Sequence, residues 1–202
     1  MIKSKEDYKY YLEADRIALA PYHKRPPLIP IYESDIIWMF LRMLRRVEYY
    51  HNCKNNGLNK IYYKFLQYRL FRLQKKYLLG IPINVFGPGF SISHLGPIVV
   101  NGFAKVGKNC RLHPFTQIGI DGKSDGVAVI GDNVYISCGV KIIGNVKIAD
   151  GITIGANAVV TKSFETPDIT IAGVPAKQIS SKGNFLDPSR RGADIAKAPS
   201  KQ

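Results

Sequence analysis

Two of the four histidines, His94 and His113, lie after residue 80 and are the side chains best suited to acid–base chemistry. His94 sits in the sequence "GFSISHLGPIVVN". A neutral imidazole is the natural group for taking a proton from a hydroxyl near neutral pH. The alternative is a partly buried structural histidine, because His94 falls in the inward phase of the repeat described below if that phase is extended backward. His113, in "CRLHPFTQIG", follows an inward-facing leucine and should point outward, toward substrate or solvent.

The cysteines offer a weaker route to chemistry. Cys138 could carry an acyl group, since thiols do so when a base lowers their pKa. It has no histidine near it in the sequence, so Cys138 and Cys110 are explained more simply as packing residues. Three cysteines without CxxC spacing predict neither a disulfide framework nor a zinc site. The two histidines after residue 80 are too few for a three-histidine metal site. "GKS" at 122–124 is not a P-loop, because Gln117 stands where that motif needs glycine.

A six-residue repeat must position these side chains. An aliphatic residue recurs at every sixth position in one phase that only Ser124 breaks: Val100, Val106, Leu112, Ile118, Ile130, Ile136, Ile142, Ile148, Ile154 and Val160. A second column, two residues ahead, holds small or branched residues: Ile98, Ala104, Cys110, Thr116, Val134, Val140, Val146, Ile152 and Ala158. A helix would need spacings of three and four, and a simple strand would alternate. The spacing predicts a mainly β fold, a parallel β-helix whose coil has three short strands.

The chain is predicted to have three parts. Eleven of its twelve tyrosines precede residue 81, which marks a change of composition near Gly80. We expect an α-helical N-terminal domain over 1–80, a β-helix domain over 81–180, and a tail over 181–202 that is disordered.

Within the first part, helix signals alternate with breakers. A first helix is expected from Ser4 toward Ala20, a second with Ser34 as its cap, and a third from about Asn59 to Leu79. Farther along, the proline- and glycine-rich stretch 81–97 should form an irregular first coil, and 120–127 a loop that leaves the coil wall.

The net charge is +14, and residues 1–80 contribute +9 of it from sixteen Lys or Arg against seven Asp or Glu. Such a basic, aromatic segment could touch anionic lipid, nucleic acid or a polyanionic substrate, although a solvated helical face explains it as well. Standard nucleic-acid motifs are missing from the sequence, so we expect no nucleic-acid partner and at most peripheral membrane contact. The sequence contains neither a long apolar run nor a secretory signal, which predicts a cytoplasmic protein.

The motifs "ISHLGPIVVNGFAKVGKNCRLHPFTQIG", "GKS", "IGDNVYISCGVKIIGNVKIADGITIGANAVVTKSF" and "IAGVPAK" resemble the serine acetyltransferase branch of the hexapeptide-repeat acyltransferases. The resemblance covers residues 83–179. It implies a left-handed parallel β-helix, a homotrimer or a dimer of trimers, and acetyl-CoA as co-substrate in the groove between subunits, with no metal. His94 matches the catalytic base of that family.

The sequence also departs from the branch. Ser93 stands where the family has the aspartate that binds the amino acid, and "SDGVAVI" lacks the family's His-Pro. Sequences with "IPINVFGPGF" before the histidine and a tyrosine-rich helical front resemble the O-acetyltransferases of capsule and O-antigen biosynthesis. We therefore predict an acetyl-CoA-dependent O-acetyltransferase whose acceptor is a sugar hydroxyl of a surface polysaccharide. Serine O-acetylation in cysteine biosynthesis is the alternative, and a non-catalytic β-helical scaffold is the third hypothesis.

In the predicted mechanism, His94 deprotonates the acceptor hydroxyl, which attacks the thioester directly, while backbone N–H groups of the coil turns stabilise the oxyanion. The carboxylate that orients His94 is expected to be Asp15, with Glu48 or a backbone carbonyl as alternatives. The predicted substrate contacts are Asp15, Ser93, Asn101 and His113. The predicted cofactor contacts are small residues that admit the pantetheine arm and lysines that could meet the CoA phosphates or only solvent: Lys123, Ser137, Cys138, Gly155, Ala156, Lys162 and Lys177.

Overall fold

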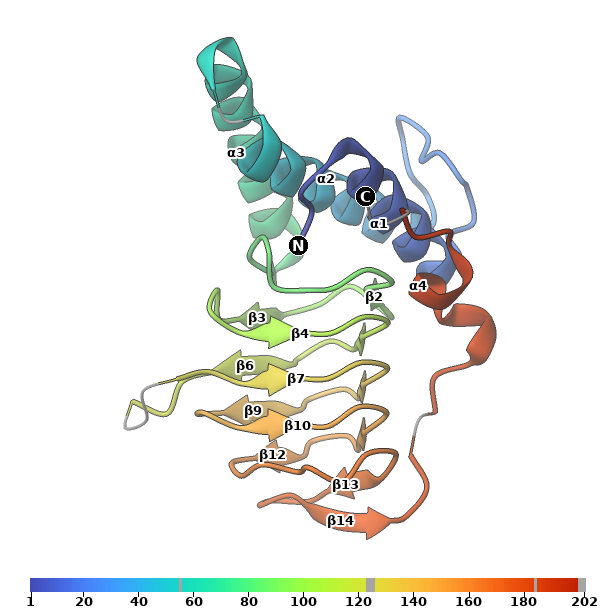
Figure 1. Cartoon of the computed structure of the whole chain (residues 1–202), viewed down its shortest axis with the longest axis vertical. Helices are drawn as coiled ribbons and strands as arrows, with labels where there is room; N and C mark the ends of the chain where they lie inside the picture. The colour runs from blue at the N-terminus through green and yellow to red at the C-terminus, as the bar shows by residue number, and fades with distance from the viewer. Residues whose placement is uncertain (55, 123–125, 184, 200–202) are drawn as a thin grey trace.

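The structure, a computed structural model, describes residues 1–54, 56–122, 126–183 and 185–199. A layer of helices stands on one end of a three-sided coil of short strands (Figure 1). The three long helices are α1 (Lys5–Leu19), α2 (Glu33–Cys53) and α3 (Gly57–Tyr77).

Three walls of short strands build the coil. One wall contains, in spatial order, β1 (Leu79–Gly80), β3 (Ile98–Val100), β6 (Gln117–Gly119), β9 (Lys141–Ile143) and β12 (Val159–Val160). A second contains β4 (Lys105–Val106), β7 (Val129–Ile130) and β10 (Lys147–Ile148). The third contains β2 (Ser91–Ile92), β5 (Arg111–Leu112), β8 (Tyr135–Ile136), β11 (Thr153–Ile154), β13 (Thr170–Ala172) and β14 (Lys177–Ser180). Neighbouring strands are parallel, apart from β13 and β14.

The predicted parallel coil is confirmed, and the six-residue repeat forms its core. The strand register stacks equivalent positions, as it does for Leu112 over Ile136 and Ile118 over Ile142. All residues of both predicted columns are buried, and none exposes more than 6% of its surface. Burying one such aliphatic side chain contributes roughly 1.5–3 kcal/mol, so the stacked columns stabilise the coil along its whole length.

The helix starts differ from one another in how they are capped. Ser4 caps α1 as predicted, because its Oγ accepts a hydrogen bond from the Asp7 N–H at 2.9 Å. The predicted cap at Ser34 is wrong. Helix α2 begins at Glu33, two residues earlier than a cap at Ser34 implies, and the Ser34 Oγ instead accepts a hydrogen bond from the Tyr22 N–H at 3.2 Å. That earlier start places Glu33 in the first helical turn.

A buried polar cluster joins the helices to the first coil. The Arg45 guanidinium of α2 is fully buried, and its Nε donates to Asp15 Oδ2 of α1 at 2.7 Å, while Nη1 donates to Glu48 Oε2 at 2.9 Å. It also donates to the carbonyl oxygens of Phe86 and Gly87, at 2.9 and 2.7 Å. Burial raises the pKa of Asp15 to about 6, against the opposing effect of the Arg45 charge. The orientation of α2 on the coil therefore depends on charged side chains that water does not reach.

The expectation that 181–202 is disordered is wrong for the described part of that segment. The chain runs back along the coil to the helices (Figure 1) and forms two short helical turns, η1 (Pro188–Arg190) and α4 (Gly192–Ile195). Arg190 donates to the Leu19 carbonyl at 2.6 Å, and the Tyr10 hydroxyl donates to the Ala193 carbonyl at 2.8 Å. Composition suggested disorder because the partners that order this segment lie more than 170 residues away.

Candidate active site

His94 lies on one edge of the coil, formed by the turns that follow the strands of the six-stranded wall. The register aligns Ile92 with Leu112 and Leu112 with Ile136, so the turns after these residues stack in a column. Successive turns are separated by about 4.8 Å, the usual spacing between paired strands. We name this column the His94 edge, and it consists of residues 93–97, 113–116, 137–140 and 155–158.

The turn that carries His94 is two residues longer than the turn below it. A step of eight residues leads from Ile92 to Val100, whereas a step of six leads between their register partners, Leu112 and Ile118. The six-residue phase therefore does not extend backward through this turn. The His94 side chain is 67% exposed, which contradicts the alternative of a partly buried structural histidine.

Glu33 reaches this turn from the helical layer. Its Oε2 lies 3.0 Å from His94 Nδ1, and its Oε1 accepts a hydrogen bond from the Leu95 backbone N–H at 2.6 Å. Because an ionised carboxylate only accepts hydrogen bonds, a neutral His94 ring beside it carries its hydrogen on Nδ1 and presents a lone pair at Nε2. An imidazole held in this tautomer can act as a general base toward a bound hydroxyl.

The first turn of α2 is fixed by the loop that precedes it. The buried Asp35 carboxylate accepts a hydrogen bond from the His23 N–H at 3.0 Å and lies 2.6 Å from His23 Nδ1. Trp38 Nε1 donates to the Lys24 carbonyl at 2.9 Å. A carboxylate in a first turn also lies near the positive end of the helix dipole, which favours Glu33 as an anion at this position. The pair is thus positioned by an element outside the repeat.

The predicted role of Asp15, as orienting carboxylate and substrate contact, is wrong. Asp15 has no exposed surface and is bound to Arg45 and to the Phe90 N–H. The alternative partner, Glu48, is also held by Arg45. Sequence reasoning missed Glu33 because 61 residues separate it from His94 and no local spacing relates a helix start to a coil turn.

His113 lies on the His94 edge in the next turn, half-buried rather than free in solvent. Its Nδ1 is 2.9 Å from the Ile136 carbonyl oxygen, to which it donates, and its Nε2 accepts a hydrogen bond from the Tyr135 hydroxyl at 3.1 Å. Burial lowers the pKa of His113, which keeps the ring neutral. Both ring nitrogens are engaged, and a substrate role for His113 stays a prediction.

The two other predicted substrate contacts lie in different places. Ser93 immediately precedes His94, and its buried Oγ has no hydrogen-bond partner within the described residues. Asn101 lies on a different edge, after β3, where its Oδ1 accepts a hydrogen bond from the Phe103 N–H at 2.9 Å. The structure therefore brings Ser93, but not Asn101 of the same chain, to His94.

Four of the predicted cofactor contacts share the His94 edge. Ser137 and Cys138 occupy its third turn, and Gly155 and Ala156 its fourth. The Cys138 and Ala156 side chains are exposed, so Cys138 is not packed in the core of this chain, whereas Cys110 is fully buried as predicted. Small side chains thus line this edge below the two histidines.

The three predicted lysine contacts lie in different places: Lys177 pairs with Ala172, which is in register with Gly155 of the His94 edge, whereas Lys162 lies on another side of the coil. Lys162 is exposed after β12, with its Nζ 5.6 Å from the centroid of the Phe164 ring. Lys177 is exposed at the start of β14. Lys123 lies outside the described residues. A role for these lysines in cofactor binding stays a prediction.

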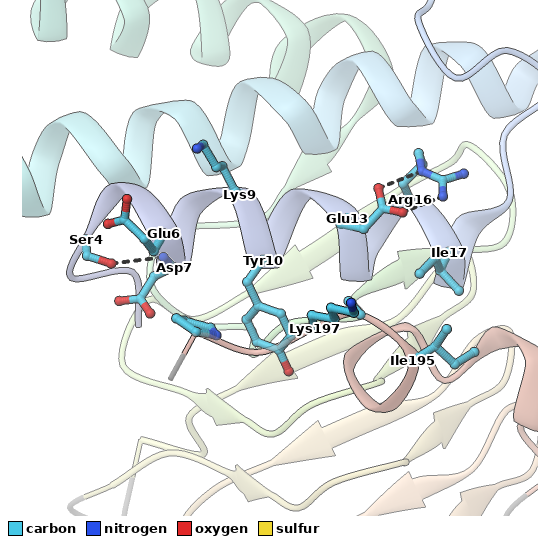
Figure 2. A pocket seen from close by; sticks show the side chains of 12 residues that line it. Ser4, Glu6, Asp7, Lys9, Tyr10, Glu13, Arg16, Ile17, Ile195 and Lys197 are labelled. Carbon is cyan, nitrogen blue, oxygen red and sulfur yellow. Dashed lines mark hydrogen bonds and ion pairs between the residues drawn. The ribbon is translucent and has the colours of Figure 1, made fainter. Parts of the chain in front are cut away.

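A separate groove of about 1150 Å³ lies between α1 and residues 195–199, as Figure 2 shows. Some of its polar groups are paired within α1, and the Tyr10 hydroxyl donates to the Ala193 carbonyl of the C-terminal segment. Glu13 and Arg16 form an ion pair at 2.6 Å, and Ser4 accepts the Asp7 N–H as the helix cap. The groove therefore belongs to the docking of the C-terminal segment, and the chemistry described above lies elsewhere.

Among the residues that the structure describes, no group of three or more His, Cys, Asp or Glu is arranged to hold a metal ion. Nor is any described helix both long enough and apolar enough to cross a membrane.

Comparison with known proteins places this architecture. The family described as bacterial transferase hexapeptide (six repeats) matches residues 128–162. A serine acetyltransferase of Synechococcus elongatus is 30% identical over 125 residues, covering 59% of this chain and 51% of that protein. One of Staphylococcus aureus strain Mu50 is 30% identical over 144 residues, covering 63% and 67%. A crystal structure of Neisseria gonorrhoeae serine acetyltransferase is 27% identical with a TM-score of 0.61, covering 93% of this chain and 69% of that one. A structure of the same enzyme in complex with serine is 25% identical, with a TM-score of 0.59.

The parallel coil of six-residue steps and these matches define a hexapeptide-repeat transferase, and the chain belongs to that family. Within it, the chain belongs to the serine acetyltransferase-like branch. It spans about half the length of the cyanobacterial relative.

These comparisons correct the predicted acceptor. The relatives and the Neisseria gonorrhoeae structure are serine acetyltransferases, which contradicts the predicted sugar hydroxyl of a surface polysaccharide. That prediction depends on departures from the branch such as Ser93, and the comparisons do not support a carbohydrate acceptor. The carbohydrate prediction is wrong, and the serine alternative is favoured.

Proposed function

We propose that this protein transfers the acetyl group of acetyl-CoA to the hydroxyl of L-serine. The observation that carries the proposal is the exposed His94–Glu33 pair, with Nδ1 and Oε2 3.0 Å apart. Serine as acceptor is supported by the relatives, which are serine acetyltransferases by name, one of them solved in complex with serine.

In the proposed mechanism, bound acetyl-CoA supplies an activated acetyl thioester. His94 Nε2 takes the proton of the serine hydroxyl as its oxygen attacks the thioester carbonyl carbon, and the imidazolium returns that proton to the departing thiolate. Glu33 fixes the ring tautomer and stabilises the imidazolium through Nδ1. General-base catalysis of this kind contributes about 10²- to 10⁴-fold to a rate.

The residues of the His94 edge fit the narrow pantetheine arm of CoA. Ser137, Gly155 and Ala156 are small, and they stack below the His94 turn in strand register. Ala156 is exposed and leaves the coil edge accessible. We propose that the arm runs along these turns and that Cys138 contacts it through packing.

We further propose a left-handed coil and a homotrimer. As the chain descends from the helices in Figure 1, it passes behind through β3 and returns in front through β4, which supports a left-handed coil. The outside of the coil carries apolar side chains suited to contact with another copy: Val99 is 59% exposed, Phe103 85% and Phe115 56%. A second copy beside the His94 edge would also cover an imidazole that a single chain leaves in solvent.

The test is thiol release from acetyl-CoA by the full chain, with L-serine, D-serine, glycine and nucleotide sugars as acceptors. We expect turnover with L-serine and a decrease of about 10²- to 10⁴-fold in the variant His94→Ala. Circular dichroism of both proteins controls for folding. Turnover confined to sugar acceptors, or equal rates in the two proteins, contradicts the proposal.

A further inference from the structure

We propose that the outer face of α3 binds an anionic lipid surface. We define this outer face as the side chains of α3 that are exposed to solvent. The inference is independent of the acetyl transfer proposed above, because it rests on a different element.

The charge of α3 has one sign. The helix carries six basic residues and no acidic residue, and all six basic side chains are exposed: Lys60, Lys64, Arg69, Arg72, Lys75 and Lys76. No ion pair neutralises any of them within the described part of the chain. Each Lys or Arg near an anionic membrane contributes about 1 kcal/mol to binding, a factor of about five in affinity.

The same face carries large apolar side chains that the fold leaves uncovered. Tyr63, Leu66 and Leu70 are the buried residues of α3, on the side that packs against α2. A second stripe at helical spacing faces solvent, and its members are strongly exposed: Leu58 (85%), Ile61 (71%), Phe65 (51%) and Tyr68 (56%). A helix that packs one face on its own fold and exposes a second apolar face needs another partner for that face.

The basic and apolar side chains are interleaved on the outer face. The Arg69 guanidinium lies 5.8 Å from the Phe65 ring centroid, and Arg72 lies 5.9 Å from that of Tyr68. Arg69, Arg72 and Tyr68 also line a groove of about 930 Å³ between α2 and α3. Aromatic rings beside cationic heads are the arrangement with which helices bind the headgroup region of a bilayer.

The exposed apolar stripe favours a lipid bilayer over a nucleic acid as the polyanion that binds these charges. A nucleic acid would pair with the cations but would leave Leu58 and Ile61 in water, whereas a bilayer takes both kinds of side chain. A second copy of the same face would bring twelve like charges together. The start of α3 projects beyond the rest of the molecule, at the end opposite β14 (Figure 1). Lipid could therefore reach this face while the coil remains in solvent.

The experiment measures cosedimentation of the full chain with vesicles. We expect binding to vesicles of 70% phosphatidylcholine and 30% phosphatidylglycerol, weaker binding at high salt, and little binding to pure phosphatidylcholine. The triple variant Lys64→Gln/Arg69→Gln/Arg72→Gln should lose at least tenfold in affinity. The matched control, Lys105→Gln/Lys147→Gln/Lys182→Gln, removes the same charge from exposed lysines elsewhere and should bind like the wild type.

A second variant tests the apolar stripe. Ile61→Ser/Phe65→Ser keeps the charge and should also weaken vesicle binding, without changing the oligomeric state measured by sedimentation. Equal binding by the charge variant and its control overturns the proposal. So does unchanged vesicle binding of the serine variant together with tight binding of a DNA duplex, which would make the face a general polyanion site. Loss of oligomers in the serine variant without lipid would assign the face to a second copy and also overturns it.

Discussion

His94 and His113 occupy neighbouring turns of the same edge, yet of the two only His94 has a ring nitrogen without a partner among the described residues. His113 lies in a regular turn, where the coil below closes around it through the Ile136 carbonyl and the Tyr135 hydroxyl. Strand β2, which precedes His94, lies at the end of the six-stranded wall nearest the helices. In the described part of the chain, no further coil stacks on this turn from that side. Its neighbour is α2, which contributes Glu33. Within the repeat, the polar groups of a turn are satisfied by the next coil. A reactive site therefore remains at the end of the repeat, where a helix packs instead of another coil.

The difference between the His94 turn and the His113 turn depends first on the position of α2, which the buried Arg45 cluster holds against the coil. Arg45→Met should lower the free energy of unfolding by about 3–5 kcal/mol, because it leaves Asp15 and Glu48 buried without their counter-charge. Urea unfolding followed by circular dichroism measures this. The control Arg42→Met, on the same helix but only half-buried, should cost much less.

The pH dependence of the stability of Arg45→Met tests whether charge causes this loss of stability. In the wild type, burial raises the pKa of Asp15 from 3.8 to about 6. Between about pH 4 and 6 the folded chain therefore binds more protons than the unfolded chain, and this contribution to stability falls as the pH rises. Without Arg45 the Asp15 carboxyl is harder to ionise in the folded state, so the variant should regain more stability than the wild type between pH 8 and pH 5. A pH-independent difference would show that packing, rather than charge, holds α2.

The second prediction concerns Glu33, the side chain that α2 contributes to the His94 turn. Glu33→Gln keeps an acceptor for the Leu95 N–H but removes the charge beside His94 Nδ1. We expect kcat to decrease about 10- to 100-fold, with the KM of serine and of acetyl-CoA within about threefold, because the imidazolium loses its partner. Steady-state kinetics measure both, and Glu33→Asp should recover part of the rate.

The matched control is Glu6→Gln, which also removes a carboxylate from the first turn of a helix. It should leave kcat unchanged. If Glu33→Gln instead raised the KM of serine at constant kcat, Glu33 would bind the amino acid rather than orient His94, and the comparison between the two turns would lose its basis.

The limits of sequence reasoning follow from the same difference. The core columns, such as Leu112 and Ile136, could be predicted because each repeat faces the same surroundings as its neighbours. The edge on which Ser137 and Ala156 lie follows from that register. The partner of His94 could not be predicted, because Glu33 comes from a single helix start that repeats nowhere. The eight-residue step from Ile92 to Val100 likewise interrupts the six-residue phase, so the phase could not predict which way His94 points.

The smallest expected effect belongs to the lower histidine. His113→Ala removes a hydrogen bond to the Ile136 carbonyl and one from the Tyr135 hydroxyl, so it should lower stability by roughly 1–2 kcal/mol. Because neither nitrogen is free, kcat should stay within about threefold of the wild type. Tyr135→Phe removes only one of the two bonds and should cost about half as much. A collapse of kcat in His113→Ala at unchanged stability would place His113 against the substrate, and the two turns would then form one catalytic surface instead of a site above a structural repeat.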